Sequence, residues 1–304
     1  MEPCIIVHGG AWDIPEDLWD SHLRGCSAAV EEGHSFLQRG ASAVDAVEAA
    51  VKVMEEDPTF DAGLGSFLNA DGEVEMDATI MDGDDLSFGA VAAVQHILHP
   101  ISLARQVMER TQHCMLVGDG ALRFARSIGV PTVPHESLLT QREFERWQEI
   151  KRRQSFEDRE FFDPTRDRYS PRGTVGAVAI DSKGKIAAAT STGGTPNKMA
   201  GRVGDSSLVG CGNYADSKCA GVSATGWGEP LMKTVIARRV CHSLEDGMNV
   251  KQAGDEAIRY LEDRVKGYGG VIILDKDGNM SYSHNTPKMA IAGIGAGATI
   301  FKHI

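Results

Sequence analysis

The stretch Gly173-Thr174-Val175-Gly176-Ala177-Val178-Ala179-Ile180 divides this chain of 304 residues into two parts of different character. From Val175 onward it is a run of small and apolar residues, which is typical of a buried β-strand. A turn at 181–184 and a second apolar run over 185–191 predict an antiparallel partner strand. We therefore expect the fold to be organised around this pair of strands, with Thr174 at the start of the first.

The residues before Thr174 are of the opposite kind. The composition shifts at about residue 135, and the later part of this stretch is dense in charge and lacks apolar periodicity. It predicts a solvated, mobile linker over about 150–173. Gly173 lets the backbone bend freely at a strained bond, and a mobile segment that ends at a hydroxyl residue suits self-cleavage. By position alone, Thr174 could also be an ordinary β-branched residue at a strand start.

The rest of the chain alternates between strand patterns and helix patterns. Mixed strands with helices in pairs are best buried as two sheets covered by helices on the outside, an α/β sandwich, which we expect to form a single domain over 1–304. The predicted strands are 4–8, 88–94, 114–117 and 298–302, with hairpins over 68–82 and 271–284. The predicted helices are 16–38, 42–55, 100–111, a segment ending near 128, 229–243 and 250–266.

The composition excludes several classes of function. A net charge of −12 is unsuited to binding a phosphate backbone. No apolar stretch approaches the ~18 residues that a membrane span needs, and the first residues do not resemble a secretory signal. The six cysteines lack metal-type spacing and predict free thiols in a reducing compartment, so we expect a cytoplasmic protein.

Three short segments after the strand pair carry groups suited to chemistry, although each alone is a weak signal. A Thr-Ser-Thr-Gly-Gly run ends the second strand at 190–194. Arg202 and Asp205 offer a cation and an anion three residues apart, which is most often a surface ion pair. The glycine-rich turn at 223–229 leads into a helix, where amides could also bind phosphate.

In this order the segments closely resemble the plant-type asparaginase and isoaspartyl aminopeptidase family. The resemblance spans nearly the whole chain, with the linker as the exception. The matching motifs are His8-Gly9-Gly10-Ala11, 60–66 (FDAGLGS), 74–83 (VEMDATIMDG), 89–94 (GAVAAV), 173–179 (GTVGAVA), 189–194 (ATSTGG), 201–205 (GRVGD) and Thr225-Gly226.

The resemblance implies the four-layer αββα sandwich of the N-terminal nucleophile hydrolases. It also implies self-cleavage between Gly173 and Thr174 into an α chain, 1–173, and a β chain, 174–304, which stay together. A homodimer of such αβ pairs is implied as well. The implied activity is hydrolysis of L-asparagine to L-aspartate and ammonia, and removal of N-terminal isoaspartyl residues from peptides. No cofactor is required for it.

The resemblance makes Thr174 the nucleophile, both in self-cleavage and in substrate hydrolysis. The freed α-amino group has a pKa near ~8, so it can serve as a base close to neutral pH without a histidine. Thr192 is implied to hydrogen-bond the nucleophile. Thr225 and Gly226 are implied to supply donors for the oxyanion, where each donor is worth ~3 kcal/mol of barrier.

The implied substrate-binding residues read the head group of a free amino acid. Arg202 can hold the α-carboxylate in two parallel contacts, and Asp205 can hold the α-ammonium. The same resemblance implies three further substrate-binding residues, which line the sites of the substrate carboxylate and of the oxyanion: Thr225, Gly226 and Gly228. Asparagine and isoaspartyl peptides present such a head group, whereas an internal aspartate does not.

The chain departs from the family pattern at two positions of the site. Asp61 stands where the family commonly has asparagine, whose amide can help the oxyanion hole; a carboxylate cannot donate unless it is protonated. Trp227 stands where relatives often have histidine, and it could narrow the pocket or change the preference among peptides.

A structural sodium ion is implied by resemblance alone, because carbonyl ligands leave no signature in side chains. The implied ligands are the backbone carbonyls of Met54, Glu55, Asp57, Phe60, Ala62 and Leu64. No transition metal is implied, and the acidic residues at 82–85 are typical of a solvated turn.

Three other functions remain as alternatives. A lysosomal glycosylasparaginase would need a signal peptide. A threonine aspartase-like endopeptidase would usually carry longer insertions. A non-processing scaffold protein would not need the full set of Thr174, Thr192, Arg202, Asp205 and Thr225, so we do not favour it.

Overall fold

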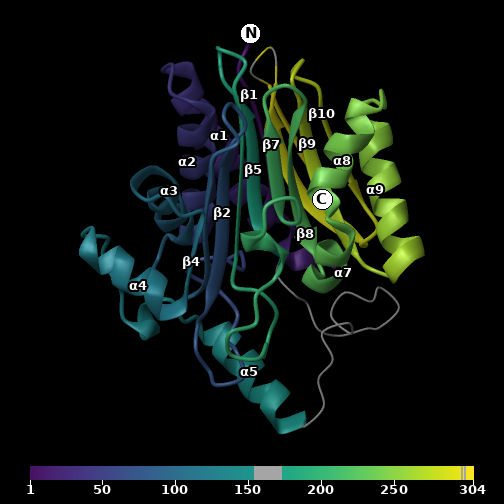
Figure 1. The fold of residues 1–304 in the computed structure, drawn as a ribbon. Helices are drawn as coiled ribbons and strands as arrows, with labels where there is room; N and C mark the ends of the chain where they lie inside the picture. The colour runs from purple at the N-terminus through teal and green to yellow at the C-terminus, as the bar shows by residue number, and fades with distance from the viewer. Residues whose placement is uncertain (154–172, 296, 298) are drawn as a thin grey trace.

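The computed structural model describes residues 1–153, 173–295, 297 and 299–304. Two β-sheets lie face to face, and helices cover the outer face of each (Figure 1). This is the four-layer arrangement of helix, sheet, sheet and helix that the sequence predicts. Most of the residues predicted to be mobile, 154–172, lie outside the described residues.

The larger sheet has eight strands in the order β12-β11-β1-β5-β6-β2-β3-β4, and every pair is antiparallel except β3 with β4. The strand β5 is near its centre because its small residues are buried on both faces. The strands are β1 (Cys4–Trp12), β2 (Met76–Asp82), β3 (Phe88–Val94), β4 (Met115–Val117), β5 (Val175–Ile180), β6 (Ile186–Thr192), β11 (Lys288–Ile294) and β12 (Ile300–His303).

The smaller sheet has four antiparallel strands in the order β10-β9-β8-β7. Its inner face packs against β1, β5 and β6 of the larger sheet. The strands are β7 (Asn213–Asp216), β8 (Ala220–Gly226), β9 (Gly269–Asp275) and β10 (Met280–His284).

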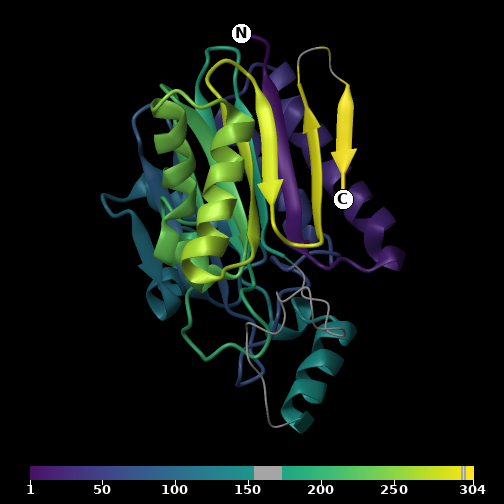
Figure 2. The same cartoon turned by 90° about the vertical axis from the view of Figure 1, so that its right-hand side faces the viewer.

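The helices form two outer layers. The first, with α1 and α2, covers the larger sheet, and the second, with α8 and α9, covers the smaller one (Figure 1). The helix α5 lies beyond one end of the sandwich (Figure 2). The helices are α1 (Trp19–Gln38), α2 (Ala43–Glu56), α3 (Pro100–Arg110), α4 (Gly118–Ser127), α5 (Gln141–Arg153), α7 (Gly228–Thr234), α8 (Ile236–Glu245) and α9 (Val250–Val265), with short 3-10 turns at Glu16–Leu18, His135–Ser137 and Asp205–Ser207.

Strand alternation divides the core into layers. On β5, Val175 and Ala177 pack with the cluster under α1 and α2, whereas Val178 and Ile180 pack between the two sheets. Because successive side chains of a strand point to opposite faces, Thr174 and Gly176 also face the second sheet.

Between the two sheets, the side chains change from apolar to polar along the strands. In the register of β5 with β6, the first two residue pairs from the Ile180 end are apolar. The third pair consists of a glycine and a hydroxyl residue. The next layer in the same direction contains Thr174 and Thr192. The paired residues are Ile180 with Ile186, Val178 with Ala188, and Gly176 with Thr190.

Several predicted elements are confirmed. The strand after Thr174 pairs with its predicted partner, β6. The helix α2 begins after Ser42, whose side chain and that of Asp45 form the expected reciprocal cap. The C-terminal strand lies at the edge of the larger sheet, as predicted.

Other predicted boundaries are wrong. The hairpin over 68–82 is only a single bridge, Leu68 with Val74, and β2 pairs with β3 and β6 instead. The helix over 229–243 is two helices, because Val235 adopts a left-handed conformation with φ of 49°. The expected turn at 223–229 begins as the last four residues of β8.

The start of the predicted linker also differs. Residues 150–153 are the last turn of α5, in which Ile150 is buried against Trp227 and Tyr268. Within α5, Arg146 pairs with Glu143 three residues away and Arg153 pairs with Glu149 four residues away, and such pairs support a helix that has few apolar residues. Among the described residues, no helix is both long enough and apolar enough to cross a membrane.

Candidate active site

Thr174 lies at the polar end of the interface between the sheets and is 7% exposed. Its hydroxyl donates a hydrogen bond to Thr192 Oγ1 at 3.1 Å, and the Thr192 hydroxyl donates to Asp61 Oδ2 at 3.2 Å. The amide of Gly194 also donates to Thr192 Oγ1, at 2.9 Å. The hydroxyl of Thr174 is therefore the first donor of a buried chain that ends on a carboxyl group.

Asp61 closes this chain and is fully buried. Its Oδ1 accepts the Phe67 amide at 2.9 Å, so both described contacts of the side chain use it as an acceptor. Burial raises the pKa of this carboxyl to about 8, opposed in part by the bond from Phe67. The structure thus places Asp61 at the end of the Thr174–Thr192 chain.

Gly173, on the other side of the candidate scissile bond, is also buried. A Cβ atom on Gly173 would lie 2.2 Å from the Cα of Gly10 and 3.0 Å from the amide nitrogen of Ala11. Gly10 itself has a φ of +106°, a conformation that favours glycine. Because Gly10 and Gly173 have no side chains, the backbone of β1 can lie against the backbone of the residue before Thr174.

Arg202, Asp205 and Gly228 lie together, as predicted. A Cβ on Gly228 would lie 2.8 Å from Arg202 Nη2 and 3.1 Å from Asp205 Oδ1. Arg202 Nη1 would also meet a Cβ on Gly194 at 3.4 Å, which places the guanidinium next to the loop that follows Thr192. The candidate substrate-binding residues therefore lie next to the hydrogen-bonded chain that begins at Thr174, with Gly194 between the two groups.

Glu229 belongs to this group, although the sequence analysis did not assign it a role. Its two carboxylate oxygens accept from Arg202 Nε and Nη2, each at 2.9 Å. This bidentate contact fixes the plane of the guanidinium. The pKa of Glu229 is lowered because these bonds to Arg202 outweigh its burial, whose effect is opposite.

Asp205 is almost fully buried, at 3% exposure. Burial raises its pKa to about 7, against the opposing charge of Arg202. Its Oδ2 has no hydrogen-bond partner among the described residues. A buried carboxyl group with a vacant acceptor is suited to binding a cationic group.

Thr225 and Gly226 end β8, the strand of the smaller sheet that faces β5 and β6. The hydroxyl of Thr225 is buried and has no partner in the described part of the chain. Gly226 has a φ of +138°, and a Cβ there would lie 2.4 Å from the Cα of Gly269. This close backbone approach requires glycine and lets β8 end at the site.

One layer deeper, three buried polar residues join the sheets and were missed by sequence reasoning. Ser223 Oγ lies 2.8 Å from His8 Nε2 and 2.8 Å from Thr190 Oγ1. A Cβ on Gly176 would lie 2.1 Å from Ser223 Oγ, so Gly176 makes room for this contact. Burial lowers the pKa of His8 to about 3, which keeps the imidazole neutral. Ser223 and Thr190 each lie two residues before a predicted site threonine, a spacing that could have revealed them.

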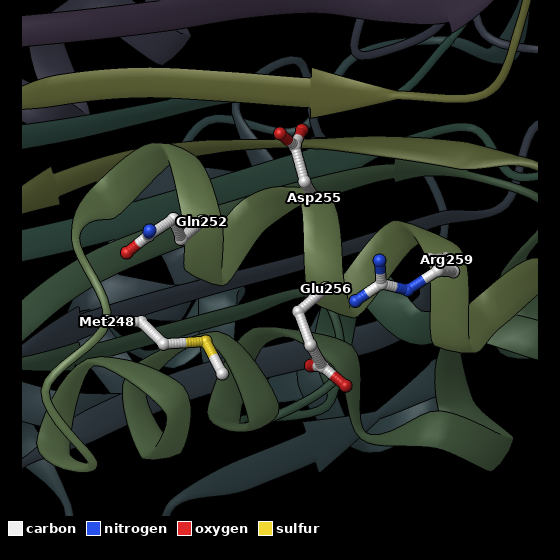
Figure 3. A pocket seen from close by; sticks show the side chains of 5 residues that line it. All are labelled: Met248, Gln252, Asp255, Glu256 and Arg259. Carbon is white, nitrogen blue, oxygen red and sulfur yellow. The ribbon is translucent and has the colours of Figure 1, made fainter.

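A hollow of about 390 Å³ elsewhere on the surface is a poor candidate for the site (Figure 3). It is formed by α9 and the residues before it. Glu256 in this hollow is held by Arg239, and Asp255 accepts from Ser283 at 2.6 Å. Solvated ion pairs therefore account for its charged side chains.

The comparisons with known proteins agree with this geometry. The sequence profile of a family described as asparaginase matches residues 1–300. The chain belongs to the asparaginase family.

Members of the asparaginase family from vertebrates are similar to the chain along most of its length. A zebrafish (Danio rerio) protein named isoaspartyl peptidase/L-asparaginase is 46% identical over 301 residues, which cover 99% of this chain and 95% of the relative. Proteins of the same name are 46% identical over 294 residues in Xenopus laevis (97% and 93%) and 49% identical over 280 residues in Homo sapiens (92% and 89%). The family predicted from the motifs is therefore confirmed.

The buried carboxyl of Asp205 predicts a pH-dependent cost in stability. An unfolded aspartate has a pKa near ~3.9. Between that value and about 7, the folded protein keeps a proton that the unfolded chain releases, so the free energy of unfolding falls as the pH rises. We expect Asp205→Asn to increase the free energy of unfolding at pH 8 by roughly 1–3 kcal/mol and to increase it less at pH 5. The midpoint temperature of unfolding should rise accordingly, more at pH 8 than at pH 5.

The matched control for this measurement is Asp71→Asn, because Asp71 is exposed. It should leave the midpoint nearly unchanged at both pH values. An equal effect of Asp205→Asn at pH 5 and pH 8 would show that the gain does not come from the charge.

Proposed function

We propose that this protein cleaves itself between Gly173 and Thr174, and then hydrolyses L-asparagine and removes N-terminal isoaspartyl residues from peptides. The observation that carries the proposal is the donor chain from Thr174 through Thr192 to Asp61. It leaves a lone pair of Thr174 Oγ1 available for attack, because the proton of that hydroxyl points to Thr192. The names of the curated relatives support both activities.

In the proposed self-cleavage, Thr174 Oγ1 attacks the carbonyl carbon of Gly173. The peptide C–N bond breaks as the new C–O bond forms, and the nitrogen of Thr174 takes up the proton that its hydroxyl loses. Water then hydrolyses the ester, which leaves a carboxylate on Gly173 and a free α-amino group on Thr174. The contact between Gly173 and Gly10 supports this step, because it holds the scissile carbonyl against a fixed backbone.

In the proposed substrate reaction, the freed amine accepts the proton of the Thr174 hydroxyl, which attacks the side-chain amide of the substrate. Ammonia or the amine of the remaining peptide leaves, and water hydrolyses the aspartyl ester. Thr192, whose hydroxyl is in contact with Thr174 Oγ1 in the uncut chain, orients the nucleophile. The Thr225 hydroxyl, with the backbone at Gly226, is proposed to bind the oxyanion, since its buried hydroxyl is without a partner among the described residues.

The proposed head-group site comprises Arg202, Asp205 and Gly228. Arg202 binds the substrate α-carboxylate while Glu229 holds its guanidinium in place. Asp205 binds the α-ammonium as a carboxylate. A substrate must therefore carry both groups on one carbon, which favours small aspartyl amides over internal residues of a protein.

The alternatives gain no support. Neither a threonine aspartase-like endopeptidase nor a scaffold protein is among the names of the similar relatives described above. A homodimer of αβ pairs and a cytoplasmic location stay predictions. Light scattering of the purified protein would test the first by molar mass, and fractionation of the source cells would test the second.

A structural sodium ion is a further part of the proposal, held by carbonyls of Met54, Glu55, Asp57, Phe60, Ala62 and Leu64. The support comes from one of these carbonyls: the oxygens of Glu55 and of Leu98 both face Gly63, where a Cβ would lie 2.3 Å and 2.7 Å from them. Carbonyl oxygens are ligands for hard cations. The ion would fix the loop that carries Asp61.

Exchange of the cation tests this site. We expect the midpoint temperature to fall by a few degrees when sodium is replaced by choline at equal ionic strength, because binding to the folded state alone adds stability. Tetramethylammonium should act like choline, which controls for the identity of the bulky cation. An unchanged midpoint at all sodium concentrations would contradict the site.

Removal of the nucleophile tests self-cleavage. Wild-type protein should separate on a denaturing gel into pieces of residues 1–173 and 174–304, the second beginning at Thr174 by mass. Thr174→Ala should remain a single chain without measurable aspartate release, because the attacking oxygen is absent. Thr174→Ser, which keeps the hydroxyl, is the matched control and should still be cut, more slowly. Cleavage of Thr174→Ala at the same bond would rule out the assigned nucleophile.

Removal of the bidentate contact tests the head-group site. Arg202→Lys should lower kcat/KM for asparagine by about 10–100-fold, mainly through KM, since a lysine cannot reproduce the two parallel bonds. The gel must first establish that this variant is cut. Arg238→Lys, which changes a half-buried arginine that is paired with Glu245, should keep wild-type kinetics. If Arg202→Lys and Arg238→Lys had equal KM values, Arg202 would not be a substrate-binding residue.

A further inference from the structure

Two thiols meet where β8 packs against α8. Cys219 is the residue before β8 and Cys241 lies in α8. Cys219 Sγ donates to the carbonyl of Cys241 at 3.4 Å, and Cys241 Sγ lies 3.8 Å from the carbonyl of Ala220, the neighbour of Cys219. Each sulfur therefore lies against the backbone of the other cysteine's segment.

The two thiols are in unequal surroundings. Cys219 is partly exposed, whereas Cys241 is fully buried. A hydrogen bond between the thiols lowers the pKa of Cys219 and, together with burial, raises the pKa of Cys241. Arg238 also favours the Cys219 thiolate, while Glu245 and Asp216 oppose it. The accessible sulfur of the pair is thus the one that ionises first.

We propose that Cys219 and Cys241 form a redox-active dithiol that peroxide closes into an intramolecular disulfide. The Cys219 thiolate attacks one oxygen of hydrogen peroxide and breaks the O–O bond, which gives a sulfenic acid and, after protonation, water. The Cys241 thiol then attacks the sulfenic sulfur, and a second water leaves. Two electrons pass from the sulfurs to the peroxide. A low-molecular-mass thiol reverses the step by exchange.

The geometry assigns the resolving role to Cys241, because it lies behind Cys219 and away from solvent. Formation of the bond requires each sulfur to leave the carbonyl that it contacts and to approach the other sulfur to ~2.05 Å. Two other thiols are in different surroundings. Cys114 is exposed, and the buried Cys26 lies near the ring of Phe60.

The disulfide would enclose the part of the β chain that carries much of the candidate site. The closed loop runs from 219 to 241 and contains Thr225, Gly226, Gly228 and Glu229, together with the left-handed break at Val235. A crosslink at its base would tie the strand that ends in Thr225 to α8. The proposal itself does not depend on the proposed hydrolase activity, since it is read from the thiols alone.

Peptide mapping of the oxidised full-length protein tests the proposal. Reduced protein is treated with a small excess of hydrogen peroxide under native conditions, the remaining thiols are alkylated in denaturant, and the protein is digested without reductant. We expect a linked peptide that joins Cys219 to Cys241 and disappears with dithiothreitol. Intact mass should show the loss of two hydrogens from the piece that begins at 174, or from the whole chain if it is uncut.

Variants distinguish this pair from general oxidation. In Cys241→Ser, Cys219 should accumulate a sulfenic acid that dimedone traps, because the resolving thiol is absent. Cys219→Ser should leave Cys241 alkylated in full, and Cys114→Ser, the matched control at an exposed thiol, should keep the linked peptide. Over-oxidised Cys219 beside a fully alkylated Cys241 in the wild-type protein would overturn the proposal. So would oxidation that yields only crosslinks between chains through Cys114 and no peptide that joins Cys219 to Cys241.

Discussion

The pairing of β5 with β6, in the register that sets Gly176 opposite Thr190, is the constraint on which the rest of the structure depends. It sends the even-numbered side chains of both strands toward the second sheet. These side chains are large and apolar at one end of the interface and become hydroxyl groups at the other. A slip of β5 by one residue would turn Thr174 toward the layer beneath the helices, on the opposite face of the sheet from Thr192.

The same constraint explains why the site is built in two levels. The deeper level, with His8, Thr190 and Ser223, satisfies buried polar groups within the protein, and it needs the space that Gly176 leaves. The outer level, with Thr174, Thr192 and Thr225, keeps a hydroxyl without a described partner. The hydrogen bonds of Ser223 to His8 and Thr190 hold the strands of the deeper level in position, and the Thr225 hydroxyl above them remains available for a ligand.

Much of this could be read from the sequence because the signals are local. Small apolar runs and their turns identify β5 and β6, and Ser42 with Asp45 identifies the start of α2. The split at Val235 was not predictable, since a β-branched residue rarely adopts a left-handed conformation. The bond of Glu229 to Arg202 was not predictable either. An acidic residue is favourable at the start of any helix, so its presence there does not indicate a bond to an arginine. Asp61 was doubtful as a donor, and only its contacts with Phe67 and Thr192 reveal it as an acceptor.

The bond between Arg202 and Glu229 has a consequence for how a charged ligand approaches. A guanidinium that already faces a carboxylate presents little net field to solvent, and the protein as a whole carries a charge of −12. A zwitterionic amino acid is therefore not drawn in from a distance, and it meets an arginine whose counter-ion is in place from the start. In the proposed head-group site, its carboxylate would take over or share bonds that Glu229 already makes, so recognition would be an exchange of partners at short range. Selectivity in that proposed site would depend on the fit of two opposite charges at fixed spacing, and simple anions would gain little from it.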